Sequence, residues 1–147
     1  PHVVEAFEGD NKLSHLLTYG GHAAACAAAL ANLEIIEGEG LVKNSAKMGA
    51  RLLEGLNGLR SHRTVGDVRG LGLLAGVELV KDKDTKEKFL ESDSAIVDLN
   101  QGLQDRGLLT RAANVISLSP PLCITEAQVD KVVEIIDDSL TAIEKEL

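Results

Sequence analysis

Two places in the sequence bring together residue types that could bind a charged ligand. The first is the stretch LLTYGGHAAACAAAL at residues 16–30, in which Thr18 and the pair Gly20–Gly21 precede an alanine-rich run. A hydroxyl and backbone N–H groups at the start of a helix are donors that suit an anion. On residue types alone, however, the simplest interpretation is that Thr18 caps the helix or a turn.

The second place is Arg111, which follows LLT at residues 108–110 and precedes SPPL at residues 119–122. A guanidinium is planar and always charged, and it can pair with a carboxylate through two hydrogen bonds. The alternative is a surface arginine that pairs with a nearby acidic side chain. Arg69 is interpreted as a structural residue, and His22 as a residue that packs in the loop without a catalytic role.

The composition argues against several other classes of function. The net charge of −8 leaves no basic surface for the phosphates of a nucleic acid. No uncharged apolar run is long enough to span a membrane. The four histidines and the two cysteines, Cys26 and Cys123, lack the spacing of a metal site. We therefore expect no metal, and two buried thiols in a reducing, cytoplasmic compartment.

Hydrophobic periodicity predicts two helices and then a strand. We expect a helix over residues 21–37, buried on most sides because its small side chains allow neighbours to approach closely. A second helix over residues 41–59 carries one apolar stripe. Alternation of apolar residues with glycines predicts one strand over residues 68–80, and the glycines on one of its faces indicate the close approach of a packed element.

The remaining elements complete a small α+β unit. We expect a helix over residues 92–107, a hairpin of two short strands within residues 108–119, and a last helix that begins at Thr125. Thr125 and Gln128 have the spacing of a capping box. The order predicts a three-stranded antiparallel sheet with its helices on one face.

Four segments, in this order, resemble the C-terminal part of class III aminotransferases: LTYGGHAAACAAALANLEIIE, VRGLGLLAGVEL, RGLLTR and LSPPLCITEAQVD. The resemblance covers essentially the whole chain and is nearest to the ω-amino acid:pyruvate transaminases. It implies the fold type I architecture of enzymes that depend on pyridoxal phosphate (PLP). Residues 1–60 would close the large PLP-binding domain and supply connecting helices, and residues 61–147 would form the small C-terminal domain.

The resemblance also implies an activity and two site residues. The enzyme would be a cytoplasmic homodimer that moves an amino group from an amine or amino acid to an α-keto acid. Thr18 and a nearby backbone amide would bind the phosphate of the PLP held in the partner subunit's site. Arg111 would be the mobile group that binds the carboxylate of the substrate and swings away for amines without one. Ala23 departs from the family, which often has a proline after the histidine.

The catalytic lysine of the family has no counterpart in this sequence. Fold type I enzymes need a lysine that forms a Schiff base with the cofactor, and in the family it precedes the threonine motif by a few tens of residues. Lys12 lies too close to Thr18 and in a different context. We therefore expect a fragment that is inactive alone. The alternative is a non-catalytic dimerisation or interaction module with the same fold.

Overall fold

The computed structural model describes residues 2–10, 12 and 17–147, so His15 and Leu16 lie outside the described residues. Within these ranges no helix combines the length and the apolar character that a membrane crossing needs. The elements are α1 (His2–Glu5), α2 (Ala23–Gly38), α3 (Leu41–Gly58), the 3-10 helix η1 (Leu59–Ser61), β1 (Val65–Leu71), β2 (Leu74–Leu79), α4 (Ser94–Asp105), β3 (Arg111–Ala112), β4 (Val115–Leu118) and α5 (Glu126–Glu144).

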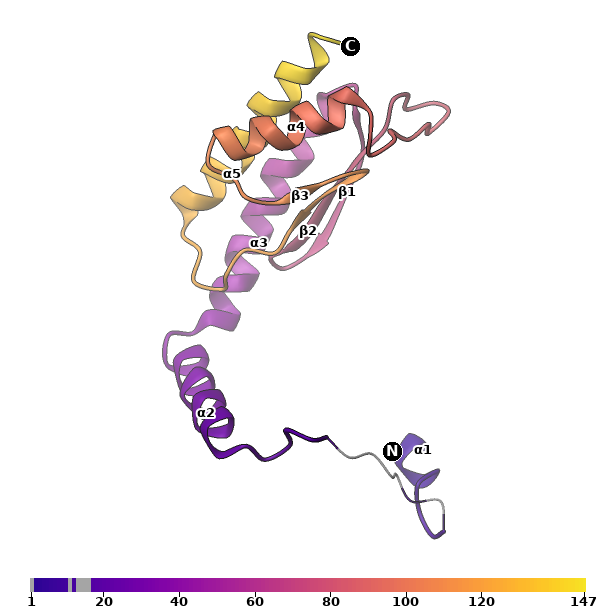
Figure 1. Ribbon diagram of the computed structural model, residues 1–147. Coiled ribbons are helices and arrows are strands. Elements are labelled where there is room, and N and C mark those ends of the chain that lie inside the picture. Colours follow the sequence, from indigo (N-terminus) through magenta and orange to yellow (C-terminus); the bar gives the residue numbers. More distant parts are fainter. Residues whose placement is uncertain (1, 11, 13–16) are drawn as a thin grey trace.

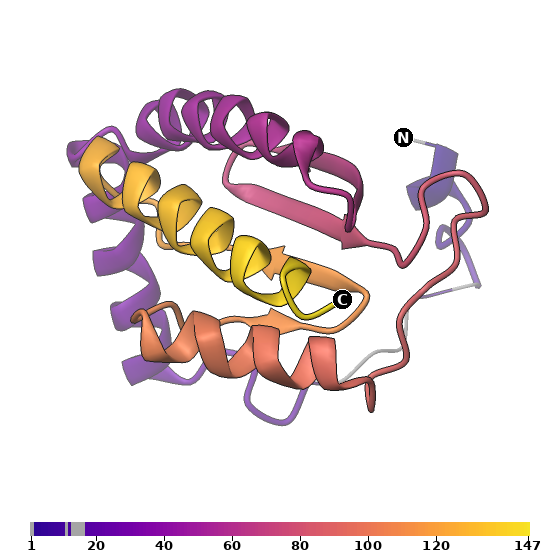
Figure 2. The same ribbon diagram turned by 90° about the horizontal axis from the view of Figure 1, so that it is seen from above.

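The elements from α3 onward form two layers. The helices α3, α4 and α5 lie on one face of an antiparallel sheet, as Figures 1 and 2 show. The predicted α+β class and the placement of the helices on one face are confirmed. The sheet has four strands in the order β1-β2-β4-β3, which corrects the predicted number of three.

The additional strand comes from a turn inside the segment predicted as one strand. Residues 68–80 contain the end of β1 and all of β2, which pair as an antiparallel hairpin. The chain turns at Gly72, whose φ of +56° is a conformation that favours glycine. Apolar residues continue to alternate through the turn, so the period of two did not reveal it.

Glycines let α3 lie directly on this hairpin. A Cβ atom added to Gly49 of α3 would lie 2.3 Å from the carbonyl carbon of Gly72. One added to Gly70 would lie 2.9 Å from Cδ2 of Leu53. Real Cβ atoms essentially never approach so closely, so either side chain would force a shift. The close approach predicted from the strand glycines is therefore confirmed.

The core is an aliphatic layer between the sheet and the helices. The apolar stripe predicted for α3 is confirmed, because Met48, Leu52 and Leu56 are buried. They belong to the same cluster as Val77 of β2 and Ile136 of α5. Helix α3 thus packs together with the second half of the chain, and the domain division near residue 60 stays a prediction for the whole protein.

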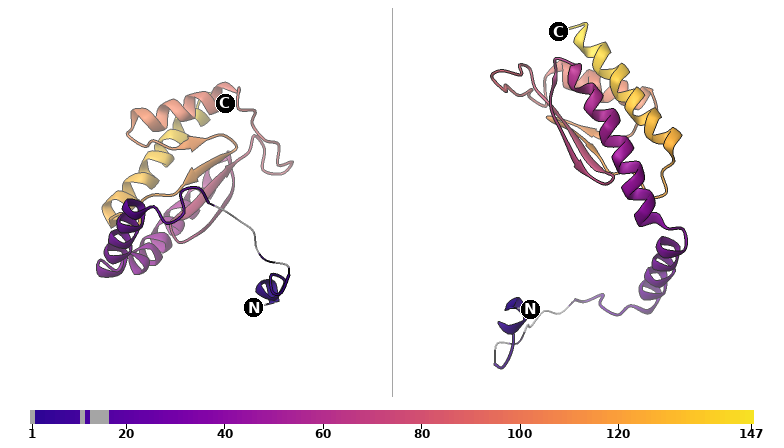
Figure 3. Two further views of the ribbon diagram at one scale, coloured as in Figure 1. Left: turned by 60° about the horizontal axis from the view of Figure 1, so that its bottom comes forward. Right: turned by 180° about the vertical axis from the view of Figure 1, so that it is seen from behind.

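Helix α2 lies outside this core and corrects two predictions. None of its residues is buried, and it extends away from the sheet (Figures 1 and 3). Burial on most sides is therefore wrong for this chain, because α3 is the main packing partner of α2 among the described elements. The thiols of Cys26 on α2 and Cys123 in the loop before α5 are both exposed, so their predicted burial is also wrong.

The N-terminus of α5 is closed by the predicted capping box. The Gln128 side-chain oxygen accepts from the Thr125 N–H at 2.9 Å, and the Thr125 hydroxyl accepts from the Gln128 N–H at 3.4 Å. Each side chain thus satisfies a backbone donor that the helix leaves without a partner. The capping box thus closes the start of α5 with side chains of the helix terminus itself.

The other end of α5 is tied to the segment before β1 by His62. Its Nε2 lies 2.6 Å from Asp137 Oδ1, and its Nδ1 lies 3.0 Å from Glu144 Oε2. Ionised carboxylates only accept, so both contacts are hydrogen bonds when both ring nitrogens carry protons. Burial lowers the pKa of His62, but the hydrogen bonds to Asp137 and Glu144 raise it more, so the pKa lies above its ordinary value.

Glu144 connects this histidine to β1. Its second oxygen accepts from the N–H and the hydroxyl of buried Thr64, at 2.9 and 2.6 Å. Burial raises the pKa of Glu144, but the hydrogen bonds from Thr64 and His62 outweigh that effect, and the pKa lies below its ordinary value. The end of α5 and the start of the sheet are therefore joined through an ionised carboxylate.

The packing of α5 on α3 predicts different effects for two adjacent substitutions. A Cβ added to Gly55 of α3 would lie 2.8 Å from Cγ2 of Val133, so Val133→Asp places a charge against α3. We expect it to lower the free energy of unfolding by roughly 2–3 kcal/mol. Glu134→Ala, the control, removes only an exposed ion pair with Lys131 and should cost less than about 0.5 kcal/mol. Urea denaturation measures both, and equal midpoints would contradict the packing of Val133 against α3.

The His62 contacts predict that stability falls as the pH rises from about 6 to 8. Because the pKa of His62 is raised by folding, its contribution is fully present below the unfolded value of about 6.5 and is lost as the pH rises through the folded value. The lowered pKa of Glu144 gives a contribution that is present above roughly 4.3 and lost at lower pH. The urea midpoints measured at about pH 6 and about pH 8 should differ less in His62→Gln than in the wild type. An unchanged difference would refute the contribution of protonated His62 to stability.

Candidate functional site

The turn before α2 places Thr18 on the surface. The N–H of Gly20 donates to the Leu17 carbonyl at 2.9 Å, and Gly21 has a φ of +74°. Thr18 itself is exposed. The helix begins at Ala23, later than the predicted start at Gly21, because the positive φ of Gly21 ends the turn first.

His22, and not Thr18, caps α2. It occupies the N-cap position, and its Nδ1 accepts from the Ala25 N–H at 3.3 Å. The interpretation of Thr18 as the helix cap is therefore wrong, and His22, which was expected to pack in the loop, is instead an exposed helix cap. Histidine is not among the preferred N-cap residues, so residue type gave no signal for this position.

The cap leaves donors at the start of α2. The first N–H groups of a helix have no acceptor within the helix, and His22 accepts only the one from Ala25. The N–H groups of Ala23 and Ala24 have no acceptor among the described residues. An added Cβ on Gly21 would meet no heavy atom of the described chain within 4 Å. Thr18 is exposed, and an anion can approach these amides at the start of α2.

Arg111 begins β3 and lies at the edge of the sheet. Its side chain is 82% exposed, and its guanidinium lies 3.8 Å from Glu91 Oε1. An ion pair this exposed contributes about 0–1 kcal/mol, so the pairing with an acid that was considered for Arg111 is present but weak. The guanidinium can leave Glu91 at little cost.

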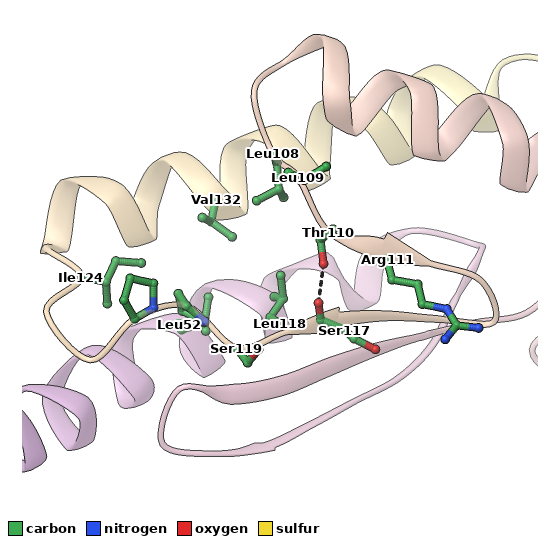
Figure 4. A pocket seen from close by; sticks show the side chains of 12 residues that line it. Leu52, Leu108, Leu109, Thr110, Arg111, Ser117, Leu118, Ser119, Ile124 and Val132 are labelled. Carbon is green, nitrogen blue, oxygen red and sulfur yellow. Dashed lines mark hydrogen bonds between the residues drawn. The ribbon is translucent and has the colours of Figure 1, made fainter. Parts of the chain in front are cut away.

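A cavity of about 550 Å³ opens beside Arg111 (Figure 4). Its walls come from α3, from α5, and from the strand segments on both sides of the β3–β4 hairpin. The lining residues are Leu52, Leu108, Leu109, Thr110, Arg111, Ser117, Leu118, Ser119, Pro120, Pro121, Ile124 and Val132. Figure 4 shows aliphatic side chains at one end and Arg111 pointing away from them at the other. The cavity therefore has an apolar end and a cationic rim.

A second hollow of about 360 Å³ lies on the other side of the same arginine. Glu91, Asn100, Gln104 and Arg111 are among its lining residues. Arg111 thus stands at a rim that two hollows share, with Glu91 on the side away from the apolar cavity.

The structure does not bring Thr18 and Arg111 together. Thr18 precedes α2, which extends away from the sheet, whereas Arg111 lies on the sheet itself (Figures 1 and 3). No contact between these two residues is found in the described chain. The two predicted site residues therefore lie in separate parts of the molecule.

Arg69 has the structural role that was predicted. It donates to Glu78 at 2.6 Å across the β1–β2 pair and to Asp67 at 3.1 Å on its own strand. Its hydrogen bond lowers the pKa of Glu78. For Asp67, the hydrogen bond from Arg60 is the larger cause and that from Arg69 the second, and together they lower the pKa.

Sequence and structure comparisons agree on one family of proteins. The family model described as aminotransferase class-III matches residues 2–140. A taurine–pyruvate aminotransferase from Bilophila wadsworthia is 45% identical, and the match covers 97% of this chain and 33% of that protein.

Solved transaminases have the same fold. An (S)-enantioselective omega-transaminase from Thermomicrobium roseum matches with a TM-score of 0.85 and 38% identity, over 97% of this chain and 32% of its own. An amine transaminase from an uncultivated Pseudomonas species, solved with PLP bound, has a TM-score of 0.85 and 36% identity, and the match covers 97% of this chain and 33% of that protein. The chain spans about a third of the length of these relatives. From the match over residues 2–140 it follows that the chain belongs to the class III aminotransferases.

Proposed function

We propose that the chain forms the C-terminal third of a PLP-dependent aminotransferase that moves an amino group from an amine or amino acid to an α-keto acid. The observation that carries this proposal is the 45% identity with a taurine–pyruvate aminotransferase over 97% of the chain. That relative makes pyruvate the first acceptor to test. The exposed apolar surface of α2 also supports the proposal, because such a helix is typical of the interior of a larger protein.

The residues around Thr18 fit the phosphate group of PLP. They offer a hydroxyl and the N–H groups of Ala23 and Ala24 on an open surface, and a helix N-terminus favours negative charge. When bound, PLP supplies the electron sink for reactions at the substrate carbon. The role of Thr18 is to hold the phosphate, and we propose that it does so in the site of the partner subunit of a homodimer.

Arg111 binds the carboxylate of the substrate in this proposal. Its guanidinium stands at the rim of the apolar cavity and is held only by a weak ion pair with Glu91. A carboxylate can therefore draw it inward, whereas an amine without a carboxylate leaves it near Glu91. The apolar end of the cavity suits the hydrocarbon part of a substrate.

The lysine that bonds the cofactor is proposed to lie outside this chain. The chain then supplies the groups that hold the phosphate and the carboxylate, and it does not catalyse transamination alone. The free thiols of Cys26 and Cys123 are compatible with a reducing compartment such as the cytoplasm.

The carboxylate role predicts a selective defect for Arg111→Ala in the whole enzyme. The two half-reactions are measured separately, because the keto acid also carries a carboxylate. The half-reactions of amino acids and keto acids should weaken about ten- to a hundredfold, which corresponds to about 1.5–3 kcal/mol for a charged hydrogen bond. The half-reaction of a simple amine should be little affected. An equal loss for both substrate types would indicate a folding role instead.

The phosphate role predicts that Thr18→Ala weakens the retention of PLP. Loss of one hydrogen bond to a charged phosphate is worth roughly 1.5–3 kcal/mol. Gel filtration followed by measurement of the remaining cofactor gives the result, and Thr18→Ser, which keeps the hydroxyl, should behave like the wild type. Equal retention by Thr18→Ala and Thr18→Ser would refute the role.

A mixed dimer tests whether Thr18 acts across the subunit interface. One subunit carries Thr18→Ala, and the other carries a replacement of the lysine that bonds the cofactor. If Thr18 serves the partner's site, the only site with an intact lysine receives its threonine from the other subunit. The intact lysine belongs to the Thr18→Ala subunit, so the threonine that serves its site comes from the other subunit and is native. PLP should then be retained as in the wild type. Weak retention would mean that Thr18 acts within its own subunit.

A further inference from the structure

Asn100 makes a paired contact with the backbone of the strand that carries Arg111. From α4, its amide nitrogen donates to the Ala112 carbonyl at 2.5 Å, and its amide oxygen accepts from the Ala112 N–H at 3.1 Å. The same nitrogen donates to the carbonyl of Ile96, four residues earlier on α4, at 2.8 Å. One side chain therefore satisfies both polar groups of a backbone residue.

This contact replaces a neighbouring strand. β3 has only two residues and forms the edge of the sheet. In a strand, the N–H and C=O of one residue point to the same side, so both groups of Ala112 face away from β4. Ala112 is buried, where unpaired backbone groups are costly. The amide of Asn100 supplies the donor and the acceptor that another strand would have provided.

Arg111 lies between two anchored neighbours. Ala112 is held by Asn100, and the hydroxyl of Thr110 donates to the carbonyl of Ser117 across the hairpin. The Arg111 side chain is 82% exposed, and the carboxylate paired with it in the described chain is that of Glu91. Its backbone is thus fixed while its guanidinium remains free to move.

We infer that Asn100 is a positioning residue for Arg111: by pairing with Ala112, it holds β3 so that the guanidinium stays at the rim shared by the two hollows. The inference rests on the proposed carboxylate role of Arg111. Asparagine is a poor residue for the interior of a helix, and its amide is used here to hold a strand and not to touch the substrate. Without this contact, the edge strand moves and the charge no longer faces the carboxylate in a defined place.

Asn100→Asp in the whole enzyme tests the inference. The substitution keeps the size and the acceptor but removes the donor, and it places a carboxylate beside the carbonyl oxygens of Ala112 and Ile96. We expect the concentration for half-maximal rate to rise about tenfold in the half-reaction of an amino acid. The maximal rate of that half-reaction should change much less, and a simple amine should react as with the wild type.

A matched control is Asn57→Asp. Asn57 also donates to the carbonyl four residues earlier, that of Leu53, at 2.7 Å, but it lies on α3 and accepts from Arg60. Hydrogen exchange over residues 108–113 gives a readout that does not depend on the cofactor. It should become faster in Asn100→Asp and stay unchanged in Asn57→Asp. Unchanged exchange in both variants would overturn the anchoring of β3.

A double variant separates positioning from folding. If Asn100 acts through Arg111, adding Asn100→Asp to Arg111→Ala should cause no further loss with amino acids. An additive loss, or an equal loss with simple amines, would overturn the positioning role. A selective loss in Arg111→Ala with none in Asn100→Asp would refute this inference alone. An unselective loss in Arg111→Ala would refute the proposed role of Arg111, and this inference with it.

Discussion

One aliphatic layer between the sheet and the helices holds the second half of the chain together. The sequence has two phenylalanines, one tyrosine and no tryptophan, and of these only Phe89 belongs to the core of the described chain, so the core has few large side chains with which to fill gaps. The gaps are closed by bringing backbones together, as where Gly49 meets Gly72. This close approach fixes α3 on the hairpin, and with it the wall that Leu52 contributes to the cavity.

Polar contacts fix both ends of α5. The capping box closes the start of α5, and the ring of His62 joins its last turns to the segment before β1. When His62 is protonated, its charge also relieves the repulsion between the carboxylates of Asp137 and Glu144. Stability and acidity are therefore linked at the point where the last helix meets the sheet.

The parts of this fold that depend on local sequence could be predicted, and those that depend on distant partners could not. Thr125 and Gln128 are three residues apart, and the α3 stripe repeats within one helix, so both were predicted correctly. A glycine such as Gly72 occurs in strands and in turns, so its residue type did not reveal the positive φ that makes the turn. The exposure of α2 depends on which other parts of the protein pack against it, and the periodicity of its sequence carries no information about those partners.

The same distinction applies to the candidate site. Thr18 and Arg111 were identified by resemblance, but neither the cap at His22 nor the anchor at Asn100 was. Asn100 and Ala112 are twelve residues apart and meet only after α4 has packed on the sheet edge. The signal for this role in the sequence is the placement of Asn100 inside a helix, because asparagine usually weakens a helix and its presence there indicates another use.

The surface around Arg111 can change in two ways between related proteins: in the shape of the cavity wall, or in the charge at the position of Glu91. Leu52, Leu118 and Ile124 of the cavity wall belong to the hydrophobic core, so a change in these side chains also changes stability. Glu91 lies in the exposed segment between β2 and α4 and meets Arg111 only at its tip. A change of charge there alters the energy of the outward position of the arginine and leaves the cavity walls intact. Selection can therefore change the preferred position of the Arg111 guanidinium without changing the fold.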